Sequence, residues 1–194
     1  MLTLRRPSDG DITAFLDRQS RGSFSYAGVG GTRSSAPIGY NVDHNRVRLG
    51  EGEGAFKRAV AAVRRWEMFN IGWVTLCWPQ APIEIGQCVG ILIPLYGLWS
   101  LNACRVIYTI DAAADEVRRF GFAYGTLADH MESGEERFSV EWHRGDDSVW
   151  YDLLACSRPR HPLARLGAPL SRSLQRRFAR DSLQAMIRAV CHEG

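Results

Sequence analysis

The chain has 194 residues, of which 45% are hydrophobic and 23% are charged, and its formal net charge is +3. These values are typical of one globular domain with a sizeable core, and they exclude the strongly basic class of nucleic-acid-binding proteins. Arginine supplies nearly all of the positive charge, since Lys57 is the only lysine. We interpret this bias as the coding preference of a GC-rich genome, and not as a sign of phosphate recognition.

Cysteine and histidine show no pattern typical of a metal site or a disulfide framework. The five cysteines are scattered, odd in number and form no CxxC pair. A metal site needs three or four converging ligands, and the five histidines are widely spaced. The glycines of GVGG lack the GxGxxG spacing of a dinucleotide site. We therefore expect no metal and no cofactor.

Neither a targeting signal nor a membrane span is expected. The stretch MLTLRRPSDGDITAFL lacks the apolar core of a secretory signal. The longest apolar run, CVGILIPLYGLW, is too short to cross a bilayer and contains glycine and proline. We expect a soluble, cytoplasmic, bacterial protein with no transmembrane segment.

The first 35 residues are expected to form a helix and a loop. Residues 9–20 have the apolar spacing of a short helix, with Asp9 or Asp11 as its cap. The stretch SYAGVGGTRSSAP follows, and its composition predicts a Gly/Ser-rich loop.

A strand and a second helix are expected next. Residues 40–49 contain β-forming valines, although Asp43-His44-Asn45 predicts a turn within this strand. Residues 53–69 carry apolar side chains at three- and four-residue spacing, with arginines between them, which predicts an amphipathic helix.

A long β region follows, and then a final helix. Short breaks rich in Pro, Gly and Asp separate the candidate strands, so neighbouring strands are expected to be antiparallel. Residues 170–190 have one apolar stripe and one arginine stripe, which predicts a long amphipathic helix. The candidate strands cover residues 72–78, 86–95, 100–110, 117–127, 135–143 and 148–157.

This element order predicts an α+β fold. A sheet needs a cover on one face, and the terminal helix with its apolar stripe fits that task. A curved antiparallel sheet of about seven strands wrapped on a long C-terminal helix is the helix-grip architecture of the START and pollen-allergen superfamily. Folds of that type commonly enclose an apolar cavity between the sheet and the helix. For this chain the expected cavity rests on the analogy with that fold, because the sequence itself supplies only the order of the elements. We expect a single helix-grip domain over residues 1–194.

Several stretches resemble one family of uncharacterised proteins. They are FSYAGVGGTR, PIGYNVDHNRVRLGEGEGAFKRAVAAVRRWEMFNIGW, NACRVIYTID, RRFGFAYGTLADHMESGEERFSVEW and SVWYDLLACSRPRHPLARL. Together they resemble family nineteen-ninety among the domains of unknown function, over most of the chain from about residue 24. The resemblance implies the helix-grip superfamily, in agreement with the element order. It brings no reaction, substrate or catalytic residue.

Strand alternation predicts which side chains face the covered side of the sheet. The side chains expected on that side are mostly apolar, and a few of them end in a polar group, which is typical of a small-molecule cavity. The alternative is that its tyrosines are core residues whose hydroxyls reach a backbone partner or the surface. The expected ligand-binding residues are Tyr108, Phe120, Phe122, Tyr124, Thr126, Glu136 and Tyr151.

Three side chains are candidates for acid–base chemistry. An inward carboxylate at Glu136 is costly unless it is paired, and burial without a partner would raise its pKa. Tyr124 faces the same side, and His130 lies in the turn between the two strands. A cyclase, dehydratase or hydrolase on this scaffold requires these groups to converge on one point. The alternatives are a paired Glu136 at the strand end and a solvated His130; Asp43 with His44 is a second, weaker pair.

Two further patterns have a structural and a functional interpretation. The arginines near and on the last helix are typical of a solvated face, although they could meet an acidic partner or anionic lipid. Gly121 and Gly125 lie on the same face of one strand, where small residues relieve crowding or permit a bulge. The functional alternative is that they let the backbone approach a ligand closely. The arginines concerned are Arg158, Arg160, Arg165, Arg172, Arg176, Arg180 and Arg188.

Overall fold

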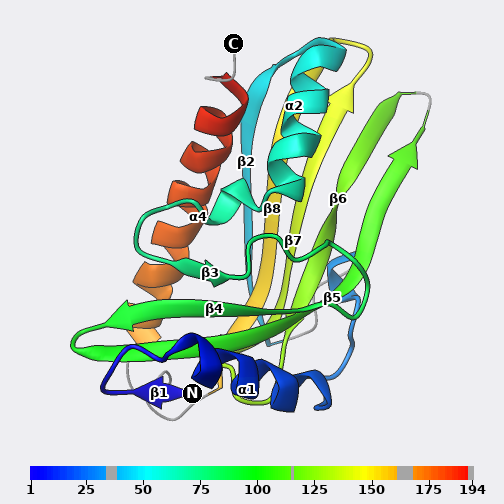
Figure 1. The fold of residues 1–194 in the computed structure, drawn as a ribbon. Helices are drawn as coiled ribbons and strands as arrows, with labels where there is room; N and C mark the ends of the chain where they lie inside the picture. The colour runs from blue at the N-terminus through cyan, green and yellow to red at the C-terminus, as the bar shows by residue number, and fades with distance from the viewer. Residues whose placement is uncertain (34–38, 115, 161–167, 192–194) are drawn as a thin grey trace.

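The structure, a computed structural model, describes residues 1–33, 39–114, 116–160 and 168–191. Its described strands form one antiparallel sheet in the order β2-β8-β7-β6-β5-β4-β3, with the short β1 paired to β5. Figure 1 shows long, curved strands on one side and helices α2 and α4 packed together over them. This is the expected helix-grip arrangement of an antiparallel sheet around a C-terminal helix.

The strands extend through most of the expected ranges. β5 and β7 are longer than the alternation predicted, because β5 runs to Ala113 and β7 begins at Glu132. The bounds are β1 Leu2–Thr3, β2 Asn41–Glu51, β3 Thr75–Cys77, β4 Cys88–Leu95, β5 Leu98–Ala113, β6 Val117–Thr126, β7 Glu132–His143 and β8 Ser148–Pro159.

Helix α1 (Asp9–Ser20) matches its predicted range, but its cap does not. The N-cap is Ser8, not Asp9 or Asp11. The Ser8 hydroxyl accepts a hydrogen bond from the Asp11 amide, and the Asp11 carboxylate accepts one from the Ser8 amide at 3.0 Å. This reciprocal capping box satisfies two amides that the first turn leaves without helical partners.

The second helix is shorter than its apolar pattern suggests. Helix α2 (Gly52–Arg64) ends before Trp66, whose φ of 58° is left-handed, and the 3₁₀ helix η2 (Glu67–Phe69) follows. Trp66 is 2% exposed and donates its indole N–H to the carbonyl of Ala81 at 2.9 Å. The tryptophan is therefore buried at the turn that ends α2.

The turn predicted at Asp43-His44-Asn45 is absent, since β2 continues through these residues. The side chains of Asp43 and His44 have partners in distant segments of the chain. Asp43 forms an ion pair with Arg172, and His44 lies 2.5 Å from the carboxylate of Asp152. Asp43 and His44 therefore do not form a pair with each other.

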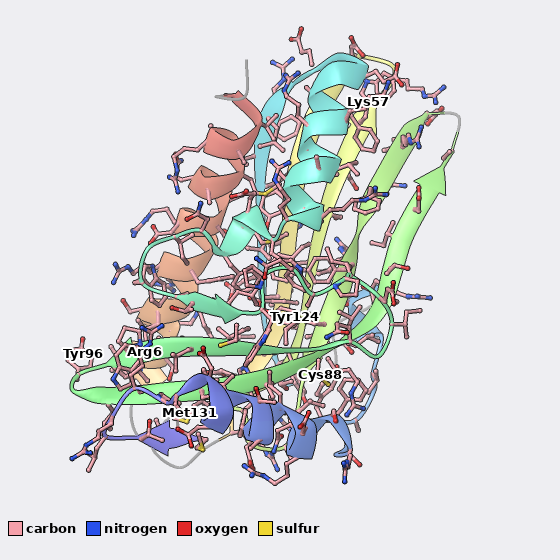
Figure 2. All side chains as sticks on the ribbon, in the orientation of Figure 1. Arg6, Lys57, Cys88, Tyr96, Tyr124 and Met131 are labelled. Atoms are coloured by element: carbon pink, nitrogen blue, oxygen red, sulfur yellow. The ribbon has the colours of Figure 1, made fainter. Side chains whose placement is uncertain are left out.

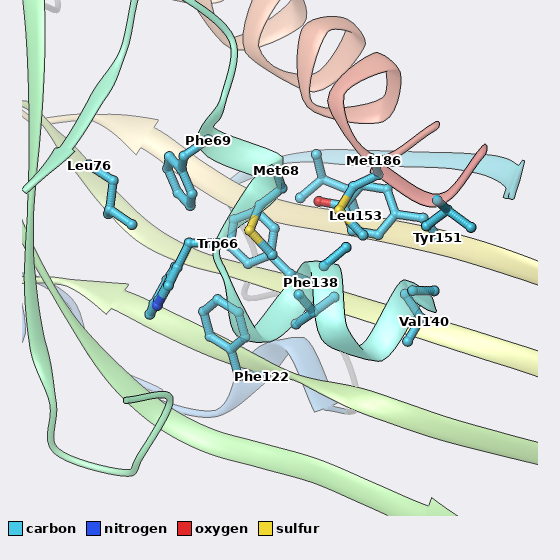
Figure 3. Packing of buried hydrophobic residues seen from close by; sticks show 14 of the residues in the cluster. Trp66, Met68, Phe69, Leu76, Phe122, Phe138, Val140, Tyr151, Leu153 and Met186 are labelled. Carbon is cyan, nitrogen blue, oxygen red and sulfur yellow. The ribbon is translucent and has the colours of Figure 1, made fainter. Parts of the chain in front are cut away.

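The main core lies between the inner face of the sheet and helices α2 and α4 (Ala168–Cys191). Trp66 packs edge-on against Phe122 at 4.7 Å between ring centroids, and Phe122 stacks on Phe138 at 5.2 Å. Figure 3 shows Met68 of η2 beside these rings, and Met186 of α4 further along the same layer beside Tyr151. A packed layer of this kind supplies most of the apolar burial that stabilises the fold.

Helix α1 covers the other face of the sheet at β3, β4 and β5. Ile12 and Phe15 pack there against Leu92 and Leu101, in a second apolar cluster. β4 is therefore buried on both faces, which explains its nearly continuous apolar sequence. Among the described helices, none combines the length and the apolarity that crossing a bilayer requires.

Candidate functional site

An apolar pocket lies between the inner face of the sheet and the N-terminal half of α4. Its volume is about 180 Å³. Strands β4, β5, β6 and β7 supply one side, α4 supplies another, and the segment after η2 closes a third. The lining residues are Phe69, Trp73, Val74, Ile91, Ile93, Leu95, Ser100, Asn102, Tyr124, His130, Met131, Glu132, Glu136, Ser171, Leu174, Gln175 and Phe178.

Aromatic rings form one wall of the pocket. The ring of Phe69 lies 5.4 Å from that of Phe178 and 6.3 Å from that of Tyr124, measured between centroids. Trp73 is fixed by its indole N–H, which donates to the Asp181 carboxylate at 3.0 Å. Such a wall offers flat apolar surface to a ring of a bound molecule.

Tyr124 and Glu136 are direct cross-strand neighbours on β6 and β7. The Tyr124 hydroxyl donates to Oε2 of Glu136 at 2.5 Å. Burial raises the pKa of Glu136 to about 7, although the hydrogen bond from Tyr124 acts to lower it. Burial also raises the pKa of Tyr124 well above its usual value, and the Glu136 charge adds to that effect. Figure 2 shows Tyr124 near the centre of the molecule.

The turn that precedes β7 adds a histidine and a second carboxyl group. Nδ1 of His130 accepts the amide hydrogen of Glu132 at 2.9 Å, so the neutral ring carries its proton on Nε2. Burial lowers the pKa of His130 to about 3. Burial raises the pKa of Glu132 to about 7, and the nearby Glu136 contributes to that rise.

Polar contacts hold α4 against the sheet beside the pocket. Arg172 forms a two-bond ion pair with Asp43 of β2, one bond of which is 2.5 Å long. One turn further, the Gln175 amide donates to the Ser157 hydroxyl at 3.0 Å. These contacts fix the helix turn that lines the pocket.

The three acid–base candidates lie around one pocket. Tyr124 and Glu136 are hydrogen-bonded to each other, and His130 lines the same space from the turn. The remaining expected residues do not line this pocket. Phe122 is enclosed in the core, and Tyr151 faces α4, where its hydroxyl lies 3.0 Å from that of Ser182.

Phe120 and Thr126 lie at opposite ends of the inward face of β6. Phe120 is only partly buried, and the guanidinium of Arg64 lies over its ring. The Thr126 hydroxyl accepts the amide hydrogen of Gly134 at 2.9 Å and lies 2.6 Å from the hydroxyl of Ser25. Thr126 therefore joins the turn to the N-terminal loop.

The prediction that Tyr108 faces inward is wrong. The register of β5 against β6 shifts between Val106 and Tyr108, which marks a bulge. One extra residue reverses the facing of everything beyond it. Tyr108 consequently lies on the outer face, where its hydroxyl is 2.7 Å from that of Thr32 and Arg33 covers its ring.

The glycine-rich loop is anchored on that outer face by a buried carboxylate. Glu135 accepts hydrogen bonds from the Tyr26 hydroxyl at 2.9 Å, the Gly30 amide at 2.5 Å, and both the amide and the hydroxyl of Thr32. Added to Gly125, a Cβ would lie 2.1 Å from the Tyr26 hydroxyl. The small residue at this position therefore serves close packing of the loop.

The arginines of α4 are mostly engaged within the molecule. Besides Arg172, Arg180 contacts the Asp181 carboxylate at 3.1 Å, and Arg188 donates to the carbonyl of Asn70. Arg177 pairs with Asp181 and lies over the ring of Trp73. Arg165 lies outside the described residues.

Five polar residues of the pocket are absent from the predicted site, namely Ser100, Asn102, Glu132, Ser171 and Gln175. The predicted start of the strand at residue 135 leaves Glu132 in the turn, although Glu132 shares the parity of Glu136 and the strand begins three residues earlier. Asn102 and Gln175 carried no signal, because their facing depends on the β5 register and on the rotation of α4. Within the described residues, no cluster of three potential metal ligands is present.

Comparison with known proteins assigns the chain. The model of the domain of unknown function DUF1990 matches residues 25–185. The chain belongs to the DUF1990 family. A UPF0548 protein of Dictyostelium discoideum is 36% identical across 98% of this chain and 96% of its own length. A UPF0548 protein of Deinococcus radiodurans is also 36% identical, across 98% of this chain and 99% of its own length.

DUF1990 relatives occur in eukaryotes as well as bacteria. A UPF0548 protein of Arabidopsis thaliana is 32% identical across 78% of this chain and 74% of its own length. The bacterial origin expected from composition therefore stays a prediction.

Solved structures support the fold assignment of this DUF1990 protein. A START superfamily protein from Mycobacterium smegmatis superposes with a TM-score of 0.50 at 14% identity, covering 80% of this chain and 100% of that one. Ara h 8.0201 gives the same score and coverage at 9% identity. The fold is thus the helix grip of the START and pollen-allergen type.

Proposed function

We propose that this DUF1990 protein binds a small hydrophobic or aromatic molecule in the pocket between the sheet and α4. The observation that carries the proposal is the pocket itself, whose walls are mainly apolar and aromatic with a few polar groups at defined positions. That makeup is typical of a ligand site, in which apolar surface supplies affinity and the polar groups set orientation.

The pocket's size limits the part of the ligand that it encloses. A cavity of about 150 Å³ lined by apolar residues accommodates benzene. The 180 Å³ found here fits one ring with a short substituent. A longer ligand would extend past the mouth.

Two tryptophan substitutions on α4 test the proposal. Leu174 lines the pocket, whereas Leu170, one turn earlier on the same helix, is 40% exposed and does not. Indole binding is measured by NMR, from the methyl signals of Ile91 and Ile93. Leu174→Trp is expected to fill the pocket and abolish binding, and Leu170→Trp to leave it intact. Indole shifts that persist in Leu174→Trp, or no shifts in the natural protein, would contradict the proposal.

A second candidate function is acid–base catalysis in the same pocket. It is favoured by the convergence of Tyr124, Glu136 and His130 on one space. A carboxyl group whose pKa is about 7 is available as acid and as base near neutral pH, which suits a cyclase, dehydratase or hydrolase.

Metabolite extracts incubated with protein test this candidate. Comparison by mass spectrometry should reveal a conversion that Glu136→Gln loses and that the exposed-site variant Glu53→Gln retains. Extracts that stay identical with and without the natural protein argue for binding alone.

A further inference from the structure

The pocket is acidic on one side. Glu132 and Glu136 both line it, whereas no lysine or arginine does so among the described residues. The nearby Arg172 is already held by the carboxylate of Asp43. Buried carboxyl groups without a cation are costly and must either keep their protons or find a partner.

Both carboxyl groups have unused capacity for hydrogen bonds. Oε2 of Glu132 is buried and accepts no hydrogen bond from the described residues. Glu136 receives the Tyr124 hydroxyl, yet an ionised carboxylate offers about four acceptor sites. The missing partner is therefore a donor, and a positively charged donor offsets more of the cost than a neutral one.

We propose that the ligand is a hydrophobic amine, bound as its ammonium ion beside Glu132 and Glu136 with its apolar body against Phe69, Trp73 and Phe178. This inference rests on the proposed ligand-binding function and specifies the ligand's chemical class. An ammonium group has three N–H donors, so it can donate to more than one acceptor. The apolar body of the amine needs only a flat apolar surface, which the aromatic wall provides.

Binding of a cation in this pocket is linked to the loss of protons from Glu132 and Glu136. Burial raises the pKa of Glu132 and of Glu136 to about 7, so an ammonium ion must displace the protons they hold at lower pH. Affinity should therefore rise between pH 6 and pH 8. The other titratable or charged groups that face the pair come from the turn before β7 and from four strands and one helix. They are Asp43 on β2, Cys104 on β5, Tyr124 on β6, Tyr151 on β8, Arg172 on α4 and His130 in that turn.

A matched pair of probes tests the inference on the unmodified protein. 3-Phenylpropan-1-amine and 3-phenylpropan-1-ol have nearly the same shape but differ in charge. Calorimetry at pH 8 should show at least tenfold tighter binding of the amine, and that preference should shrink at pH 6. Glu132→Gln and Glu136→Gln should each reduce it, whereas Glu53→Gln, an exposed site on α2, should not.

The outcomes separate this inference from the function on which it rests. Equal affinity for the two probes, or a preference for the alcohol, overturns the amine assignment and leaves ligand binding intact. Failure of both probes in a protein that binds indole also overturns it. Failure of both probes and of indole overturns the proposed function. The comparison of amine with alcohol in the natural protein stands even if a variant does not fold.

Discussion

The hydroxyl of Tyr124 and the carboxylate of Glu136 face each other across β6 and β7, 2.5 Å apart, and both line the pocket beneath α4. An O–H···O bond of that length is typical of an ionised acceptor. Burial opposes the ionisation of Glu136, whereas the hydrogen bond from Tyr124 favours it. The balance between these two effects therefore sets the charge state of Glu136.

Replacement of Tyr124 by Phe should raise the pKa of Glu136 above 7, because the lost hydrogen bond acts to lower it. The variant should also lose about 1.5–3 kcal/mol of stability at pH 8, the usual value of a hydrogen bond to a charged group, and less at pH 5. Carbon-13 NMR of the Glu136 carboxyl checks the pKa. Tyr108→Phe is the control, because Tyr108 lies on the opposite face, and it should leave that pKa unchanged. An unchanged pKa in Tyr124→Phe would refute the coupling.

Stability should fall as the pH rises from 5 to 8. The pKa values of Glu132 and Glu136 are raised from 4.5 to about 7 in the folded protein. A raised pKa means that the folded state binds protons more readily, so its contribution is complete below about 4.5 and is lost as the pH rises through 7. Urea unfolding across this range should show the loss, and the double variant Glu132→Gln/Glu136→Gln should flatten it. Parallel curves for the two proteins would exclude this origin.

The contribution of His130 to stability should change with pH in the direction opposite to that of Glu132 and Glu136. Burial lowers its pKa from 6.5 to about 3, so its contribution is present above 6.5 and is lost as the pH falls toward 3. His130→Asn offers an oxygen that can accept the Glu132 amide hydrogen without titrating. The free energy of unfolding of the variant, relative to that of the natural protein, should therefore rise as the pH falls from 6.5 to 4, measured by urea unfolding of both. A constant or falling difference would contradict this assignment.

Periodicity predicts the elements well because it reflects one-sided burial. The range of α1 and the facing of Phe122, Tyr124 and Glu136 all follow from it. The pairing of Tyr124 with Glu136 does not, because the register of a hairpin depends on the geometry of its turn. The predicted strand ends, 127 and 135, left that register open.

The failures have local physical causes. Tyr108 is misplaced because a one-residue bulge leaves no mark in a run of apolar residues. The polar centre of β2 reads as a turn because the partners of Asp43 and His44 come from distant segments. The pocket wall from α4 depends on the helix rotation that the ion pair with Arg172 fixes.

Gly121 should not tolerate a side chain. Added there, a Cβ would lie 2.2 Å from the carbonyl oxygen of Phe138 on the neighbouring strand, and that backbone cannot yield without breaking the pairing of β6 with β7. Gly121→Ala should therefore cost about 2 kcal/mol or more, in the range of overpacked cores. Gly145→Ala is the control, since no atom lies within 4 Å of its added Cβ. Thermal unfolding compares the two, and equal melting temperatures would refute the crowding.

Glu135 should be the main anchor of the glycine-rich loop. It is 5% exposed and accepts hydrogen bonds from Tyr26, Gly30 and Thr32. Glu135→Gln keeps the size but turns an NH₂ group toward some of these donors, so we expect a loss of about 3 kcal/mol. Hydrogen exchange should speed up at the Gly30 and Thr32 amides, while Glu53→Gln, at an exposed site, changes neither. Because Glu135 faces away from the pocket, indole binding at a temperature where the variant is folded should be unaffected. Unchanged exchange at both amides would show that the loop is held by other contacts.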